Sequence, residues 1–115
     1  MKDREHDEAM AGMYREDPAY AVQVLNSVLE DGEQGELMLM LRQMAKAFGG
    51  VQAVAGQAGL NPTQLYRTLS RDGNPTLSTF LALLKTMGMR LSVQVIGDPP
   101  SSRAADADGE FQPGA

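Results

Sequence analysis

A tight turn between two short amphipathic stretches constrains the fold of this 115-residue chain more than any other feature. Gly59 ends the first stretch, and Asn61 is a strong helix N-cap. Pro62 then stands at the first helical position, where the N–H that it lacks would have no partner within the helix. Apolar residues recur at helical spacing on both sides of the turn. The sequence therefore predicts two short helices, 51–58 and 62–70, joined at a sharp angle.

Three further helices follow from the same spacing of apolar residues. They cover about residues 18–30, 33–48 and 77–87, and Asp17 and Thr76 are placed to cap the first and the last. The side chains expected to face inward are Ala21, Val22, Leu25, Val28 and Leu29, then Leu37, Leu41, Met44, Ala45 and Phe48, and finally Leu77, Phe80, Leu81 and Leu84. Methionines at helical spacing commonly fill gaps in a core, and this is what we expect of Met38, Met40 and Met44. The fold is thus predicted to be all-α, with five helices.

The two ends of the chain lack this spacing. Residues 1–17 are acidic and are expected to be mobile, whereas residues 97–115 are rich in Pro, Gly, Ser and Asp and are expected to be disordered. Apolar and polar residues alternate over 90–96, which indicates a half-buried β-strand. A lone strand leaves its backbone groups unpaired, so we expect it to pair with its copy in a homodimer, through Leu91, Val93 and Val95. The folded domain should span residues 18–96.

Charge is distributed unevenly along the chain, whose formal net charge is −5. Residues 1–36 hold three Lys or Arg residues against ten acidic ones, whereas residues 37–96 hold six against the single acid Asp72. Asp72 belongs to the turn cluster Asp72-Gly73-Asn74-Pro75, in which Gly73 is expected to supply a positive φ. A basic segment with acidic flanks is the pattern expected when one surface meets phosphate, although a basic helical surface with solvated acidic ends gives the same pattern.

Composition excludes most enzyme chemistry. The chain has no cysteine, and its single histidine, His6, lies in the segment expected to be mobile. Because the basic segment offers only Asp72 as a carboxylate, and its place in a turn explains that residue, we expect no enzyme activity, no cofactor and no metal site. The longest aliphatic runs, 37–41 and 80–84, are five residues each, far below the ~20 needed to cross a bilayer. With a charged N-terminus in place of a signal peptide, the protein is expected to be soluble and cytoplasmic.

Two short helices joined by a tight turn inside an all-helical domain form a helix-turn-helix unit. The stretch VQAVAGQAGLNPTQLYRTLS resembles this unit in the lambda-repressor-like (Xre) superfamily at Ala55, Gly59, Leu60 and Leu65. The small Ala55 lets the two helices cross closely, Gly59 makes the turn, and Leu65 fills the shared core.

The likeness extends to the stretch LYRTLSRDGNPTLSTFLALLKTMGMRLSVQ, which is similar to the probable addiction-module antidotes, the HigA-like antitoxins of type II toxin–antitoxin pairs. The shared positions are Leu65, Tyr66, Leu69, Ser70, Gly73, Asn74, Pro75, Gly88, Arg90 and Leu91. The resemblance covers roughly residues 37–96. Thr68 departs from it by standing where superfamily members often place an aliphatic residue, and residues 1–36 resemble the family only as an acidic helical lead-in.

In helix-turn-helix proteins the second helix enters the major groove of DNA and the first crosses the backbone. On this chain the resemblance implies a base-facing set of Thr63, Gln64, Tyr66 and Arg67, and a phosphate-contacting set of Gln52, Arg71, Asn74 and Lys46. Arg67 could bind guanine and Gln64 adenine through paired hydrogen bonds. The other reading of Arg67 and Gln64 is a solvated face, and that of Tyr66 is packing against the turn.

The resemblance also implies a protein partner. Toxins of the RelE/ParE-like class are small basic proteins, and the acidic segment 1–36 could cover such a protein by charge complementarity. Two other interpretations remain at this stage: a stand-alone or prophage-type regulator without a toxin, and an interaction module whose helix-turn-helix docks a protein. Binding of double-stranded DNA at a palindromic operator by a homodimer is the leading expectation.

Overall fold

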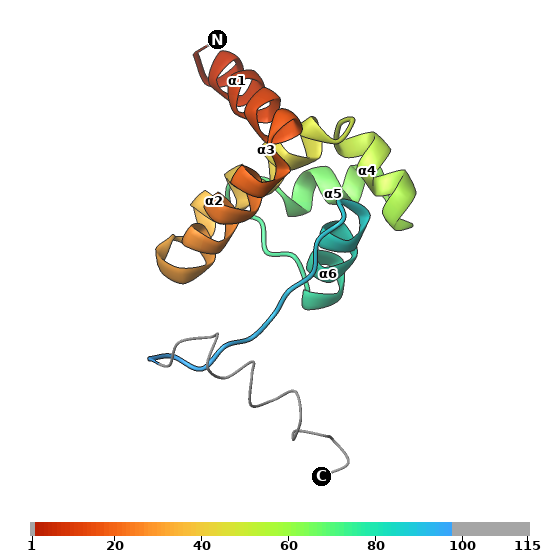
Figure 1. Cartoon of the computed structure of the whole chain (residues 1–115). Coiled ribbons are helices and arrows are strands. Elements are labelled where there is room, and N and C mark those ends of the chain that lie inside the picture. Colours follow the sequence, from red (N-terminus) through yellow and green to blue (C-terminus); the bar gives the residue numbers. More distant parts are fainter. Residues whose placement is uncertain (1, 98–115) are drawn as a thin grey trace.

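The computed structural model describes residues 2–97, which contain six α-helices (Figure 1). In chain order these are α1 (Lys2–Glu16), α2 (Pro18–Asp31), α3 (Gln34–Ala47), α4 (Val51–Ala58), α5 (Pro62–Thr68) and α6 (Leu77–Thr86). The prediction of an all-helical fold is confirmed for this part of the chain, with one helix more than expected. No helix within 2–97 combines the length and apolar character needed to cross a membrane.

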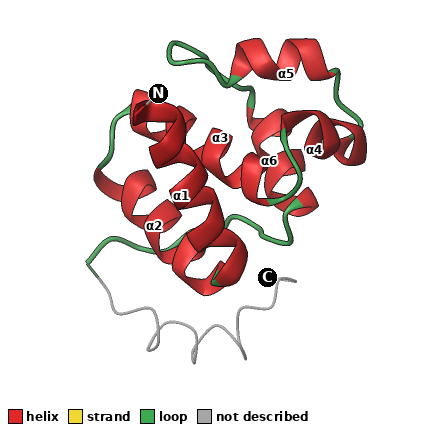
Figure 2. Ribbon diagram, turned by 90° about the horizontal axis from the view of Figure 1, so that it is seen from above, coloured by secondary structure: helices red, strands yellow, loops and turns green. Residues whose placement is uncertain are grey.

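Helix α3 is the central element. It packs against α1, α2 and α4, and Figure 2 shows α1 and α2 on one side of it and α4, α5 and α6 on the other. Its methionines Met38, Met40 and Met44 are buried, as predicted, whereas Leu37 and Phe48 are only partly buried. Because α3 is covered on several sides, its buried positions are too many to form the single stripe that the sequence analysis expected.

The expectation of a mobile N-terminal segment is wrong, because residues 2–16 form α1 and this helix packs on α3. Ala11 and Tyr14 are 1% and 2% exposed and belong to the core. These two residues and Met10, which packs beside them, form the apolar face of α1. So few apolar residues among many charged ones give no recognisable helical periodicity in the sequence. Burial against α3, more than periodicity, holds this helix in place.

Polar contacts tie α1 to α3 along its length. The Gln43 amide is 4% exposed and donates to Asp7 Oδ1 at 3.0 Å. The Lys46 ammonium lies 3.3 Å from the Glu8 carboxylate. Arg15 Nε donates to the Ala47 carbonyl at 3.1 Å, so a cation caps the C-terminal end of α3.

The predicted N-caps hold three helix starts. Asp17 accepts from Tyr20 N at 3.1 Å, Asn61 from Gln64 N at 2.9 Å, and Thr76 from Thr79 N at 3.1 Å, with the side chain as acceptor in each case. Each cap satisfies one of the backbone donors that a helix start leaves without a partner. The direction in which the chain enters α2, α5 and α6 is therefore encoded locally.

Four residues predicted to face inward are exposed instead. Val22 and Leu29 on α2 are 39% and 41% exposed, and Leu77 and Leu81 on α6 are 65% and 42% exposed. Phe80 and Leu84 on α6 are buried as predicted, but Leu83 and Met87, the residue after the helix, are buried in place of Leu77 and Leu81. Helical spacing alone admitted both faces, and packing against the neighbouring helix selected this one.

Gly73 plays a different part from the one predicted, because it does not have a positive φ. A Cβ atom at this position would lie 1.7 Å from the Thr68 carbonyl oxygen, so glycine is required by the close approach of two backbone segments. Gly59 does show the left-handed conformation, with φ of 75°, at the end of α4.

Residues 90–96 form no strand, which corrects the prediction of one there. A strand needs a partner for its backbone groups, and all the other regular elements within 2–97 are helices. The segment leaves α6 as a loop (Figure 1), with Leu91, Val93 and Val95 all exposed. Pairing with a second copy remains a prediction. The segment expected to be disordered lies outside the described residues from position 98 onward.

Candidate nucleic-acid interface

Helices α4 and α5 pack against each other through small and aliphatic side chains. Val54 and Ala55 on α4 are fully buried, and Leu65 on α5 is 2% exposed. The absence of a larger side chain at Ala55 permits a close crossing of the two helices, and Leu65 fills the space between them. Among the described helices, α5 makes its backbone contacts with α4, so most of its surface faces solvent.

The C-terminal end of α5 is held by a residue from a distant part of the chain. Arg42 on α3 donates through Nη1 to the carbonyl of Leu69, the residue that caps α5. The Leu69 side chain is itself buried. Local capping at Asn61 fixes the start of α5, and this cation fixes its end, so the helix has one orientation relative to the core.

The predicted base-facing residues all stand in solvent. Thr63, Gln64 and Arg67 are exposed, and the Tyr66 side chain is 58% exposed. The exposure of Tyr66 disfavours the alternative in which it packs against the turn. These four residues occupy one short helix whose opposite side is anchored by Leu65, so they form a single protruding face.

The predicted phosphate-contacting residues fall into two groups. Gln52 lies in the first turn of α4, and Arg71 and Asn74 lie in the loop after α5; all three are exposed. Lys46 lies near the end of α3, where its ammonium pairs with Glu8 of α1. That pair is partly solvated, but it gives Lys46 an ion-pair partner. Among the described residues, no ion pair involves Arg71.

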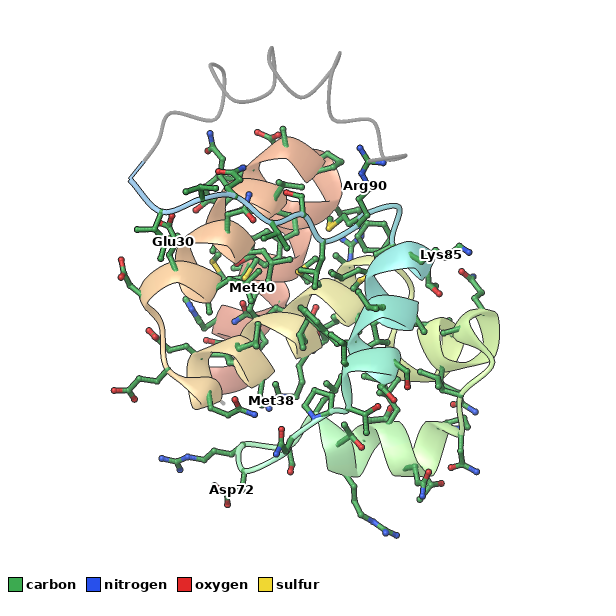
Figure 3. The ribbon with its side chains drawn as sticks, turned by 90° about the horizontal axis from the view of Figure 1, so that it is seen from below. Glu30, Met38, Met40, Asp72, Lys85 and Arg90 are labelled. Carbon is green, nitrogen blue, oxygen red and sulfur yellow. The ribbon has the colours of Figure 1, made fainter. Side chains whose placement is uncertain are left out.

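The loop that carries Arg71 and Asn74 is shaped by hydrogen bonds. Gly73 N donates to the Ser70 carbonyl at 2.8 Å, and Ser70 Oγ donates to the Arg67 carbonyl at 2.8 Å. From α3, Gln34 Nε2 donates to the Gly73 carbonyl at 3.0 Å. Figure 3 shows Asp72, which is exposed, at the tip of this loop.

Gln34 and Arg42 are residues that the sequence analysis missed. Each reaches a partner far along the chain, Gln34 the loop after α5 and Arg42 the end of α5 itself. No pattern of spacing or composition marks such a contact, because it exists only once α3 lies beside this region. Both residues support the exposed face without belonging to it.

The side chains of α5 and of the loop after it determine which ligands this surface can contact. No group of three or more His, Asp or Glu side chains within residues 2–97 could hold a metal ion. The exposed residues of α5 and of its following loop include hydroxyl, amide, phenol and guanidinium groups, which donate to or accept from base edges and phosphates. With Arg67 and Arg71 against the single acid Asp72, this surface suits a polyanion better than a cationic ligand.

Comparison with known proteins relates this surface to a family. Residues 7–95 match a family model described as "Probable addiction module antidote protein". An uncharacterized protein of Haemophilus influenzae is 30% identical over 70 residues, which are 61% of this chain and 71% of that protein. No solved structure matches the chain significantly. The family match begins at residue 7, so the likeness includes most of α1 and all of α2, well before the start that the sequence analysis gave it.

Proposed function

The chain belongs to the family of probable addiction module antidote proteins, and on that premise we propose that it is an antitoxin that binds its own operator DNA through α5 and neutralises a small basic toxin. The observation that carries the DNA half of this proposal is the protruding face of Thr63, Gln64, Tyr66 and Arg67 on a helix held at both ends. Fixed orientation matters because base-edge hydrogen bonds require side chains to start from a defined position.

In the proposed complex α5 lies in the major groove with its N-terminal residues toward the base edges. Arg67 donates two hydrogen bonds to guanine O6 and N7, and Gln64 pairs with adenine. Gln52, Arg71 and Asn74 hold phosphates on either side and set the register of the helix. Lys46 is left out of this set because of its pairing with Glu8.

One such unit contacts few bases, so we propose that two copies bind a palindrome with their recognition helices ~34 Å apart, one turn of B-DNA. Binding at the operator of the antitoxin's own operon then blocks transcription. The net charge of the whole chain does not oppose this, because most acids of residues 1–36 lie in α1 and α2, which do not contact α5. Glu33 and Glu36 lie close in sequence to Gln34, which contacts the loop after α5.

Helices α1 and α2 support the second half of the proposal. They carry seven of the fifteen acidic residues of the chain, and Glu5, Glu16, Glu30 and Asp31 are exposed on them. An acidic helical pair accelerates encounter with a basic protein and favours it over acidic competitors. A basic toxin of the RelE/ParE-like class, encoded beside this gene, is the partner we propose.

The DNA half is tested by fluorescence anisotropy with a duplex from the region upstream of the gene. Arg67→Ala should weaken binding about 5- to 150-fold, the equivalent of about 1–3 kcal/mol. Lys85→Ala is the control, because it removes a positive charge at an exposed position on α6, outside α5, the loop after it and residues 90–96. Equal affinity for Arg67→Ala and the unmodified protein would refute the proposed contact.

The toxin half is tested by co-expression with the neighbouring gene product and by toxicity in growing cells. We expect a stable complex whose formation weakens when Glu30 and Asp31 are changed to Gln and Asn, because charge complementarity is lost. The control is Asp72→Asn, which removes an acid from the loop after α5, outside α1 and α2. A toxin that stays active in the presence of excess protein would contradict the proposal.

A further inference from the structure

An apolar groove opens between the N-terminal ends of α3 and α6. Its volume is about 250 Å³, larger than the ~150 Å³ cavity that holds a benzene molecule in a protein core. Five of its lining side chains are apolar: Leu37, Met38, Pro75, Leu77 and Phe80. The other two are the amides of Gln34 and Asn74, which lie 3.5 Å apart. The groove therefore has room for one or two aliphatic side chains and no charge of its own.

The segment after α6 supplies aliphatic side chains that have nothing to pack on. Val93 and Ile96 are 96% and 98% exposed, and Val95 is 56% exposed. Scattered exposed hydrophobic residues are normal, but a run of them in one extended stretch marks a contact surface. Leu77, which lines the groove, is also 65% exposed, so the groove and the exposed face of α6 form one continuous apolar surface.

The groove does not hold the segment of its own chain. Nearly complete exposure of Val93 and Ile96 means that neither side chain touches it. Figure 3 places Met38, which lines the groove, and Arg90, which begins the segment, toward opposite edges of the molecule. The segment thus leaves its own helix on the side away from the groove.

From these features we infer that residues 90–96 of one copy seat in the groove beside α6 of a second copy, and that the exchange is reciprocal. The inference rests on the proposed function, which requires two copies on a palindrome. Two-fold symmetry makes each contact occur twice, so a modest groove contributes two equal apolar contacts to one dimer.

Charge favours a second copy over the other partners of this protein. Two identical chains of formal charge −5 repel each other, so they meet best at surfaces without acids. All seven groove residues are neutral, and residues 91–96 carry no charge. The uncharged groove offers a basic toxin no electrostatic attraction, whereas the acidic residues of α1 and α2 do.

Cysteine cross-linking tests the inference directly, since the chain has no cysteine. Leu77→Cys and Val93→Cys are made separately, mixed, and oxidised. Reciprocal seating predicts a disulfide between the two different variants, seen as a dimer on a non-reducing gel, with little from either variant alone. A mixture of Leu29→Cys with Val93→Cys is the control, because Leu29 is similarly exposed apolar surface on α2, and it should stay monomeric.

Other outcomes overturn the inference. Self-linking of Val93→Cys alone means that the two segments pair with each other as strands. A disulfide within one chain of the doubly substituted protein means that the groove takes its own segment. No cross-link, together with a monomer in sedimentation at tens of micromolar, means that no such dimer forms.

The dissociation constant of the dimer provides a second test. Val93→Ser combined with Ile96→Ser should raise the dimer dissociation constant at least tenfold, because two aliphatic contacts per copy are lost. The control combines Val22→Ser with Leu29→Ser, which removes two exposed aliphatic side chains from α2 and should leave the dimer dissociation constant unchanged. Since these residues lie outside α5, binding of half-site DNA by the monomer should persist, so failure of the inference is distinguishable from failure of the proposed function.

Discussion

Replacing Gly73 by alanine tests how the loop beside α5 is built. A Cβ atom would sit 1.7 Å from the Thr68 carbonyl oxygen, whereas real Cβ contacts essentially never fall below 3.0 Å, so the loop must move by about 1.3 Å. Such a shift disrupts two hydrogen bonds, the one from Gly73 N to Ser70 at 2.8 Å and the one from Gln34 to Gly73 at 3.0 Å. At about 0.5–1.5 kcal/mol each, their loss lowers the free energy of unfolding by about 1–3 kcal/mol.

Thermal unfolding followed by circular dichroism measures this loss, which should lower the melting temperature by roughly 4–24 °C in a domain of this size. The matched control is Gly56→Ala, at an exposed position within α4 where a Cβ meets no atom within 4 Å. That variant should gain about 0.5–1 kcal/mol, because alanine favours a helix over glycine. A Gly73→Ala protein as stable as the unmodified one would refute the argument from close approach.

Two more predictions concern stability. Asn61→Ala removes the acceptor for Gln64 N and should lower the free energy of unfolding in urea by about 1 kcal/mol, whereas Asn61→Asp, which keeps an acceptor, should not. Burial, and after it the neighbouring Tyr20, raise the pKa of the Tyr14 phenol above its ordinary 10.0. The folded protein therefore holds the phenol proton more tightly than the unfolded chain, so the contribution of Tyr14 to stability is complete below pH 10 and is lost as the pH rises beyond that. Between pH 9 and 11 the Tyr14→Phe protein should lose less stability than the unmodified protein. Equal losses would contradict the assignment.

Local signals in the sequence are enough to place α4, α5 and the turn between them. Asn61, Pro62 and Gly59 act within a few residues of themselves, so their effect on the chain does not depend on the rest of the fold. The same holds for the caps at Asp17 and Thr76. For this reason the exposed face of α5 could be listed residue by residue before the structure was known.

Features that depend on distant contacts could not be found in this way. Helix α1 is held by α3, through Tyr14 in the core and Arg15 at the helix end, and a short apolar face gave no periodic signal. On α6 the sequence predicts Phe80 and Leu84 correctly but also places Leu77 and Leu81 inward, because all four recur at helical spacing. Gln34 contacts a loop 39 residues further along the chain. The spacing of residue types in the sequence gives no information about contacts between residues so far apart.

Binding of DNA through α5 can be observed residue by residue when isotope-labelled protein is titrated with its operator duplex and the amide chemical shifts are followed. We expect the shifts to change at Gln52 and at residues 63–74, while those of α2 stay unchanged. The apparent association constant should fall with salt with a logarithmic slope of about −5 for about six neutralised phosphates. Shift changes centred on α2, or none at all in dilute buffer, would mean that α5 is not the DNA-binding helix.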